Sequence, residues 1–503
     1  QPTADTGELS AAQTAAAEAE AKLAEAQSAA ATAEAKAQEA ASAGAEAQAE
    51  AQAAVATAQA EAEAAKAQAE EAMKQAEQAA SSAPASEPVT LRAIGFESCI
   101  VDGLKLQADA YMKAHPNVTI EIEATAYTNL HDKQVIELAS GTGNFDIYSV
   151  VTEWMPEYTS AGFLEPLDDY VAADPPEDWP NTWTKGFKFQ YGADGKLYGF
   201  PHHDGPQLLY YRKDLFEDPD NQAAFKAEYG YDLAPPKTWD QFIDIAKFFT
   251  RPEEDLWGTV LTAKFGEQQL AHDFWLLLPG FGGGTGFDEN GYPTFNKQGG
   301  VEALQFYSDL INKYKVAPEA SLTYGIPEAG DFYLSGKAAM HWNWAHIGAY
   351  AELEEFSSII GKNAYTVMPK VEGVGQNAVY ASYWVLAIAK DSKNKQVAYD
   401  FIKFATDKEH DKLLAEVGCI PSRLSSWNDP QLLEKFPFYA TFQPSYEGFI
   451  TSSPRIPEYE KADDILQRYM SQVLAGETDA QSALDAAVEE LIPLLEENGA
   501  IKK

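Results

Sequence analysis

The chain has 503 residues, a formal net charge of −40 and 12% aromatic residues. Because it is acidic throughout and has no run of lysine or arginine, we expect neither a nucleic-acid partner nor attraction to an anionic lipid surface. No apolar run reaches about 18 residues, so the sequence predicts no transmembrane helix. The chain starts at Gln1 without a signal peptide, which is typical of a processed or trimmed form.

The first segment, residues 1–80, consists mainly of Ala, Glu, Gln and Lys, with Gly44 its only glycine after residue 10. These residue types favour helix strongly, so we expect an alanine-rich helical tether. Because no seam of Leu or Ile is present, we expect one helix of roughly 100 Å or a weak alanine-based association. Disordered low-complexity chain is the alternative. Residues 81–88, SSAPASEP, predict a flexible linker.

Three short apolar segments follow the linker, at 89–94, 118–124 and 145–151, and helical patterns separate them. This β-α-β-α-β order predicts a parallel sheet flanked by helices. Ligands bind such sheets at the carboxyl ends of the strands. The loops after these three strands are therefore the first places to expect a binding site.

The rest of the chain continues the mixture of helix and strand. Residues 239–250 and 301–314 have the spacing of amphipathic helices, and residues 395–405 form another. Residues 378–389 predict a buried strand that is rich in aromatic side chains, and the chain after about 422 is mainly helical. The composition supports an α/β protein with enough apolar residues for two lobes.

Six segments, in order, carry a resemblance to a known family. They are 137–170 with its glycine-rich turn, 194–217 containing DGKLYGFPHH, 235–250 beginning PPKTW, 332–347 containing GKAAM, 387–409, and 418–423, GCIPSR. Together they resemble the extracellular solute-binding proteins of family 1. The resemblance implies an α/β, two-lobed, type II periplasmic-binding-protein-like fold, here with an N-terminal alanine-rich tether that has no counterpart in the usual family pattern.

The resemblance also implies a function. Such proteins capture a sugar or polyol between their lobes and deliver it to the permease of an ABC importer, outside the cytoplasm, without a cofactor and without catalysis. A lipid on a residue preceding Gln1 would anchor the chain to a membrane, and the sequence leaves this open. We expect lobe one to comprise 89–201 plus 379–410, and lobe two 202–378 plus 411–503, with hinge closure at the crossings.

Sugars need flat aromatic side chains for stacking, and carboxylates or amides for their hydroxyl groups. The family commonly places a stacking tryptophan just beyond GKAAM, so at least one of Trp342 and Trp344 is expected to face the ligand, with both in the core as the alternative. Glu153 and Trp154 follow the third strand, where we expect Glu153 to accept a hydroxyl hydrogen bond. Otherwise Glu153 is a solvated loop carboxylate.

Polar residues also mark the first crossing between the lobes. His202, His203 and Asp204 stand in a row there, and sugar binding or hinge packing explains them better than a metal, because their spacing does not suit zinc. The glycine run 279–286 lacks the ending of a phosphate loop. The resemblance instead suggests a backbone approach to the ligand, with Trp275 as a wall of the site.

The remaining candidates lie on the returning strand and in two loops. Tyr383 and Trp384 belong to the predicted strand 378–389, and Phe96 with Glu97 follows the first strand. Arg423 is expected either to contact the ligand or to cap a helix. Two cysteines, Cys99 and Cys419, follow segments expected near the cleft, and the sequence leaves open whether they form a disulfide.

Two other function classes compete with a binding protein. Glu153 and Asp204 could imitate the paired acids of a glycoside-acting enzyme, which stand about 5 to 10 Å apart, although no hydrolase motif accompanies them. A structural cell-surface protein would explain the tether and the acidity. The sequence does not identify the sugar.

Overall fold

The computed structural model describes residues 15, 19, 22–23, 26–34, 36–37, 45–82, 87–183, 188–297 and 299–501. The backbone of Asp204 is described but its side chain is not. The chain divides into two compact units, Gln1–Pro88 and Val89–Lys503. Each unit is therefore described by itself.

The first unit contains α2 (Ala45–Ser82), a helix of 38 residues. The Gln59 side chain donates a hydrogen bond to Glu34 Oε1 over 2.7 Å. In one continuous helix these residues would lie roughly 37 Å apart, so the prediction of a single long helix is wrong. Residues 26–34 instead lie beside α2, and the alanine-based association is what the structure shows.

The paired helices meet along a seam of small side chains. The less exposed positions recur at heptad spacing, and Leu23 and Val55 are their only large members among the described residues. A buried methyl group contributes only about 0.8 kcal/mol, so this seam stabilises the pair weakly. The seam consists of residues 19, 23, 26, 30, 33 and 37 on one side and 51, 55, 58, 62, 65, 69 and 72 on the other.

We expect that removing residues 1–88 leaves the thermal unfolding of residues 89–503 unchanged, because the two units are compact separately. The isolated fragment 1–88 is expected to lose helicity gradually on heating, since an alanine seam gives little cooperativity. Circular dichroism of the full chain and both fragments measures this. A lower unfolding temperature for 89–503 than for the full chain would contradict it.

The second unit begins with the parallel strands predicted from the sequence. Strand β1 (Val89–Phe96) pairs in parallel with β2 (Val118–Thr125) on one side and β3 (Ile147–Val151) on the other. The five-stranded sheet has the order β2-β1-β3-β9-β4, and β9 (Tyr383–Ile388) runs antiparallel to β3 and to β4 (Gly199–Asp204). All residues of β3 are buried, as expected for a strand covered on both faces.

Local signals explain where the flanking helices begin and end. Helix α3 (Cys99–Ala114) begins after Ser98, whose side chain accepts a hydrogen bond from the backbone N–H of Ile100. Helix α4 (Tyr127–Ser140) ends at Gly141, whose φ of 62° suits glycine. Both helices therefore start directly after β1 and β2, near the carboxyl ends of these strands.

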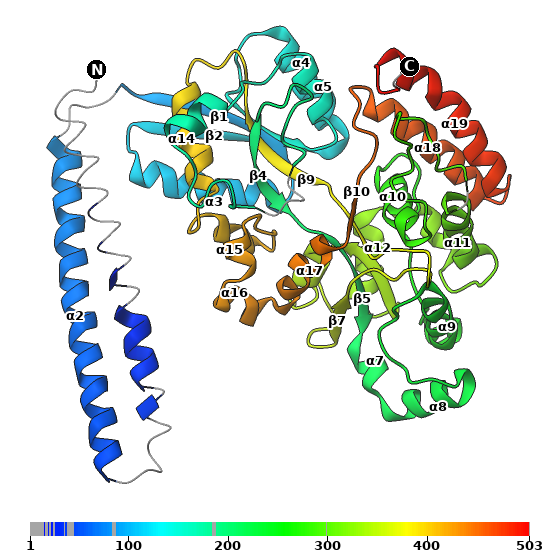
Figure 1. The fold of residues 1–503 in the computed structure, drawn as a ribbon, viewed down its shortest axis with the longest axis horizontal. Coiled ribbons are helices and arrows are strands. Elements are labelled where there is room, and N and C mark those ends of the chain that lie inside the picture. The colour runs from blue at the N-terminus through cyan, green and yellow to red at the C-terminus, as the bar shows by residue number, and fades with distance from the viewer. Residues whose placement is uncertain are drawn as a thin grey trace. The chain divides into compact units, whose positions relative to one another are not determined.

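A second sheet has β5 (Gln207–Arg212) between β6 (Met340–Trp344) and β7 (Asn363–Thr366), all antiparallel. The predicted strand 378–389 is two strands in different sheets, because β8 (Ala378–Tyr380) pairs with β10 (Phe449–Thr451) while β9 joins the five-stranded sheet. Figure 1 shows this passage between the sheets. The lobe boundaries expected from the sequence stay a prediction.

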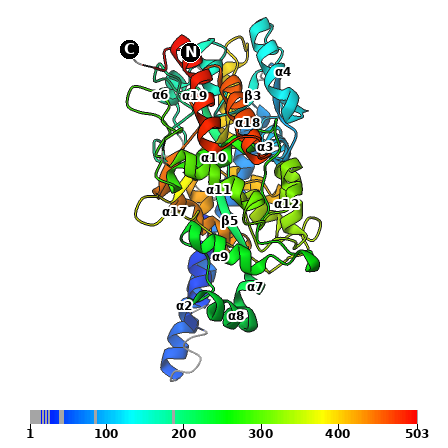
Figure 2. The ribbon, with the colours of Figure 1, turned by 90° about the vertical axis from the view of Figure 1, so that its right-hand side faces the viewer.

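Long helices cover the second sheet's side of the unit. Figure 2 shows α10, α11, α18 and α19 gathered together, and these helices pack on one another. No helix that the structure describes is both long and apolar enough to cross a membrane. The helices of this unit not bounded above are α5 (Met155–Ser160), α6 (Asp168–Ala173), α7 (Lys213–Glu217), α8 (Pro219–Tyr229), α9 (Trp239–Phe249), α10 (Gln269–Gly280), α11 (Gly300–Asn312), α12 (Ile326–Leu334), α13 (His346–Tyr350), α14 (Lys395–Ala405), α15 (Leu424–Trp427), α16 (Pro430–Lys435), α17 (Phe442–Glu447), α18 (Tyr459–Leu474) and α19 (Ala480–Glu497).

A disulfide joins the two cysteines. Cys99, the first residue of α3, is bonded to Cys419, and their Cα atoms lie 5.3 Å apart. The bond answers the question that the sequence left open. It ties the turn after β1, which begins at Glu97, directly after Phe96, to a segment 320 residues later in the chain.

Candidate ligand-binding site

Aromatic side chains meet at the carboxyl ends of the parallel strands. Phe96 ends β1, Tyr127 follows β2, and Trp154 follows β3. The ring of Trp384 in β9 lies 5.5 Å from that of Phe96 and 6.0 Å from that of Trp154, between ring centroids. Tyr127 lies 5.4 Å from Phe96 and 5.6 Å from Trp154. The strand-end rule therefore brings together side chains that are far apart in sequence.

Polar side chains connect this aromatic cluster to the beginnings of helices α10 and α18. Trp154 Nε1 donates to a carboxylate oxygen of Glu460 over 2.6 Å, and Gln268 Nε2 donates to the same oxygen over 2.9 Å. The Tyr127 hydroxyl donates to Gln268 Oε1. The beginnings of α10 and α18 thus face the loops after β2 and β3.

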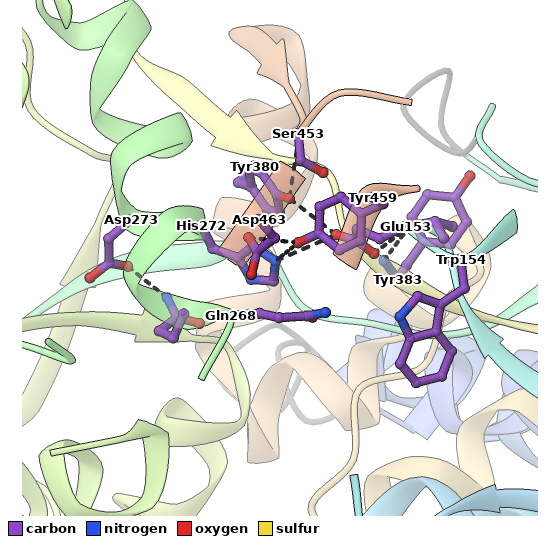
Figure 3. Close-up of polar contacts among 12 residues, drawn as sticks. Glu153, Trp154, Gln268, His272, Asp273, Tyr380, Tyr383, Ser453, Tyr459 and Asp463 are labelled. Carbon is purple, nitrogen blue, oxygen red and sulfur yellow. Dashed lines mark hydrogen bonds and ion pairs between the residues drawn. The ribbon is translucent and has the colours of Figure 1, made fainter. Parts of the chain in front are cut away.

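A buried polar cluster lies next to the aromatic one (Figure 3). Tyr380 donates its hydroxyl hydrogen to Glu153 over 3.1 Å, and His272 Nε2 lies 3.8 Å from the same carboxylate oxygen. His272 Nε2 also lies 3.2 Å from the hydroxyl of Tyr459, which donates to Asp463 over 3.1 Å. Carboxylates, hydroxyls and an imidazole are the groups that pair with sugar hydroxyls.

Burial determines the protonation of this cluster. It raises the pKa of Glu153, against hydrogen bonds from Ser382 and Tyr380 that lower it. The pKa of Asp463 is raised well above its ordinary value, first by burial and then by the nearby Glu460. Burial lowers the pKa of His272 to about 3, so its imidazole is neutral at pH 7. The cluster is rich in acids and contains no charged histidine.

Trp344 lies beside the polar cluster, whereas Trp342 does not. The Trp344 ring is 6.0 Å from that of His272 and 6.2 Å from that of Tyr380, and its Nε1 donates to Gln269 over 2.6 Å. Trp342 is 1% exposed, and its ring packs with Trp239 in the core. Both side chains lie on one face of β6, but only Trp344 stands at the end of the strand.

Two further candidates are buried and contact other parts of the protein. Trp275 is 2% exposed, and its ring packs against Phe287 and Phe295. Arg423 is 1% exposed and donates to the backbone carbonyls of Thr406 and Glu177. The structure therefore brings neither residue together with the polar cluster.

The other candidates have individual surroundings. His203 Nδ1 lies 3.0 Å from the carbonyl oxygen of Ile420, and burial lowers the pKa of His203 to about 3. Tyr383 donates its hydroxyl hydrogen to Gln190 over 2.6 Å. Glu97 is exposed. The side chain of Asp204 lies outside the described residues. Within the described ranges, no three His, Cys, Asp or Glu side chains gather as a metal ion would require.

Sequence reasoning missed half of this arrangement. The loop after β2 was expected to face a ligand, but no residue in it was singled out. The residues from α10 and α18 have no such signal, because apolar spacing in a helix indicates a core face and not the polar residues beside it. The missed residues are Tyr127, Gln268, His272, Tyr380, Tyr459, Glu460 and Asp463.

Asp273, one residue after His272, gives a prediction about pH. It is fully buried and accepts hydrogen bonds from Gln269 and Tyr307, yet burial raises its pKa to about 7. A raised carboxyl pKa stabilises the fold fully below about pH 4, and this contribution disappears as the pH rises to about 7. At about 1.4 kcal/mol per pKa unit, it amounts to at most about 4 kcal/mol.

We therefore expect Asp273→Asn to be more stable relative to the wild type at pH 7 than at pH 4, measured by urea unfolding at both values. Only this difference is informative, because buried histidines such as His202 and His341 act in the opposite direction, losing stability as the pH falls. An identical change with pH in both proteins would contradict the prediction.

The chain is similar to known proteins over most of its length. A model of the family described as bacterial extracellular solute-binding proteins matches residues 100–412. A probable ABC transporter-binding protein of Deinococcus radiodurans is 26% identical over 401 residues, which are 78% of this chain and 88% of that protein.

Two solved structures are similar over most of the chain. The maltose-bound MalE3 protein of T. maritima is 29% identical with a TM-score of 0.71, covering 81% of this chain and 100% of that one. A solute-binding protein of Agrobacterium radiobacter in complex with ribitol is 27% identical with a TM-score of 0.70, covering 81% and 99%. The two-lobed α/β fold expected from the sequence is confirmed.

Proposed function

The chain belongs to the bacterial extracellular solute-binding proteins, and we propose from this that it captures a sugar or polyol between its two lobes and delivers it to an ABC permease. Solute-binding proteins of this family serve transport and are not enzymes. Two similar structures hold maltose and ribitol, a saccharide and a polyol. Both ligands present closely spaced hydroxyl groups. A site for such a ligand must therefore offer hydrogen-bond partners to several hydroxyls at once.

The observation that carries the proposal is the contact between the two clusters. Trp154 belongs to the aromatic cluster, and its neighbour Glu153 belongs to the polar one. A sugar ring or carbon chain needs an apolar surface on one side and hydroxyl partners at its edge, and these clusters supply both. The net charge of the chain, −40, disfavours an anionic solute.

We assign roles within this site as follows. Trp344 and Phe96, which are partly exposed, stack against the ligand, with the buried Trp154 and Trp384 behind them. Glu153 accepts a hydrogen bond from a ligand hydroxyl, and Asp463, whose raised pKa favours the protonated form, both donates and accepts. His272 stays neutral and offers one ring nitrogen.

The first experiment is a thermal-shift measurement of residues 89–503 with ribitol, D-mannitol, D-tagatose and maltose. A sugar at 100 times its dissociation constant is expected to stabilise the fold by about 2.7 kcal/mol. A clear shift with one class of sugar supports the proposal and identifies that class. The absence of any shift across a broad panel of sugars and polyols would overturn it.

An enzyme that cleaves glycosides is the second candidate, since Glu153 and Asp463 are two acids in one cluster. We propose that the chain performs no such reaction. Incubation with maltose and longer maltodextrins is expected to release no reducing ends beyond those of a buffer control. Release that disappears in Glu153→Gln would establish catalysis.

The alanine-rich unit suggests where the chain works. We propose that the protein acts outside the cytoplasm and that α2 with its paired segment holds the binding unit away from a membrane, with an N-terminal lipid as the anchor. Fractionation of cells that make the full-length precursor tests this. Recovery in the membrane fraction that is abolished by removing the lipid site supports a tether, whereas recovery in the cytosol contradicts it.

A further inference from the structure

Gln207 is a buried amide without a partner. It is the first residue of β5 and is 1% exposed, and neither its Oε1 nor its Nε2 has a hydrogen-bond partner. Within the described part of the chain, it is the only side chain with two buried polar atoms in this condition. An unpaired buried amide costs free energy, so its presence needs an explanation.

The strand register places this amide beside the candidate site. Gln207 pairs directly with Trp344 across β5 and β6, and Leu209 pairs with Trp342. Because alternate residues of a strand share a face, Gln207 lies on the same face as Leu209, which belongs to the same core cluster as Trp342. Directly opposite side chains have Cβ atoms about 4.5–5.5 Å apart, so the amide lies next to Trp344.

The surroundings of Trp344 extend this placement to the polar cluster. The Trp344 ring faces His272 and Tyr380, and its own N–H is already paired with Gln269. Gln269 in turn donates to Asp273, so its amide is occupied at both ends. Gln207 is therefore an amide with free hydrogen-bonding capacity beside the proposed stacking residue.

We propose that Gln207 binds two adjacent hydroxyl groups of the sugar or polyol, a role that rests on the proposed function. A carboxamide presents one acceptor and one donor side by side, and a pair of neighbouring hydroxyls presents the complementary donor and acceptor. The bound ligand then supplies both missing partners. Without ligand, both polar atoms of the amide are unpaired, and a bound diol pairs both. A solute that lacks one of the two hydroxyls leaves one amide atom unpaired and therefore binds more weakly.

The test uses Gln207→Met, which keeps the approximate size of the side chain and removes the amide. Calorimetric titration with ribitol, D-mannitol, D-tagatose and maltose is expected to show at least a tenfold weaker affinity for whichever of these the wild type binds. Without sugar, the unfolding temperature of the variant is expected to be unchanged or higher, because an unpaired buried amide is removed. A merely structural glutamine would give a lower unfolding temperature.

Gln467→Met is the matched control. Gln467 is also a buried amide, but it donates to Asp463 and accepts from the backbone N–H of Gly266. We expect this variant to unfold at a lower temperature without sugar, because partners are left unpaired. The two variants therefore distinguish an amide that pairs only with ligand from an amide whose partners within the protein stabilise the fold.

The outcomes distinguish the two proposals. A wild type that binds sugar together with a Gln207→Met variant that binds it equally well overturns the role of Gln207 and leaves the proposed function standing. A Gln207→Met variant destabilised as much as Gln467→Met also overturns that role, because the amide then has partners within the protein. A wild type that binds no member of a broad panel of sugars and polyols overturns both proposals.

Discussion

Replacing Trp344 by alanine is expected to weaken sugar binding by about 2 kcal/mol or more, roughly thirtyfold, because a large flat ring next to the polar cluster is lost. The measurement is calorimetric titration with ribitol, D-mannitol and maltose. Trp344→Phe keeps a flat ring and is expected to lose less affinity. Alanine at this position with wild-type affinity would remove Trp344 from the site.

Trp342, two residues earlier on the same strand, provides the control for this experiment. It is 1% exposed and packs with Trp239, Phe242 and Tyr307. We expect Trp342→Ala to destabilise the fold by about 3–5 kcal/mol, as truncations of buried tryptophans do. The two tryptophans thus separate a binding defect from a folding defect in one strand.

Removing the disulfide with Cys99→Ser and Cys419→Ser together is expected to lower the free energy of unfolding by about 2–5 kcal/mol. The bond closes a loop of 320 residues, so its absence enlarges the unfolded ensemble greatly. Urea unfolding of both proteins measures the difference. We also expect weaker sugar binding, because the bond fixes the turn that follows Phe96.

Reductant supplies the control for the disulfide prediction. A reducing agent is expected to lower the urea midpoint of the wild type and to leave that of the double variant unchanged. If the reduced and oxidised wild type unfold at the same urea concentration, the bond does not contribute to stability. The double variant in the absence of reductant would then match the wild type.

The sequence predicted the three parallel strands of the first sheet and part of the site for a clear physical reason, but not that β9 joins them antiparallel. Parallel strands joined by helices have their carboxyl ends at one edge, so Phe96 and Trp154 could be expected to approach one another. Their observed contacts through Tyr127 and Trp384 follow from that geometry. The six family-like segments extended the prediction to the fold of the whole second unit.

Other parts depend on contacts that no local pattern contains. Tyr459 and Asp463 enter the site from α18, more than 300 residues after Glu153 along the chain, and the sequence around them has only the spacing of an amphipathic helix. In the alanine-rich unit, the alternative of a single long helix was wrong and that of a weak alanine-based association was right, because alanine repeats at heptad spacing although it is too small for a strong seam. Residue type suggested both alternatives and could not decide between them.

Two short connections lead directly from the five-stranded sheet to the other two sheets of the binding unit. Residues 205–206 join β4 to β5 of the second sheet, and residues 381–382 join β9 to β8, which pairs with β10. Two connections that lie apart define a hinge axis. We expect rotation about that axis to distort the two connections less than twisting or sliding does. We therefore expect ligand binding to change mainly one angle, that between the two lobes, and we propose that an ABC permease recognises the bound form by this angle.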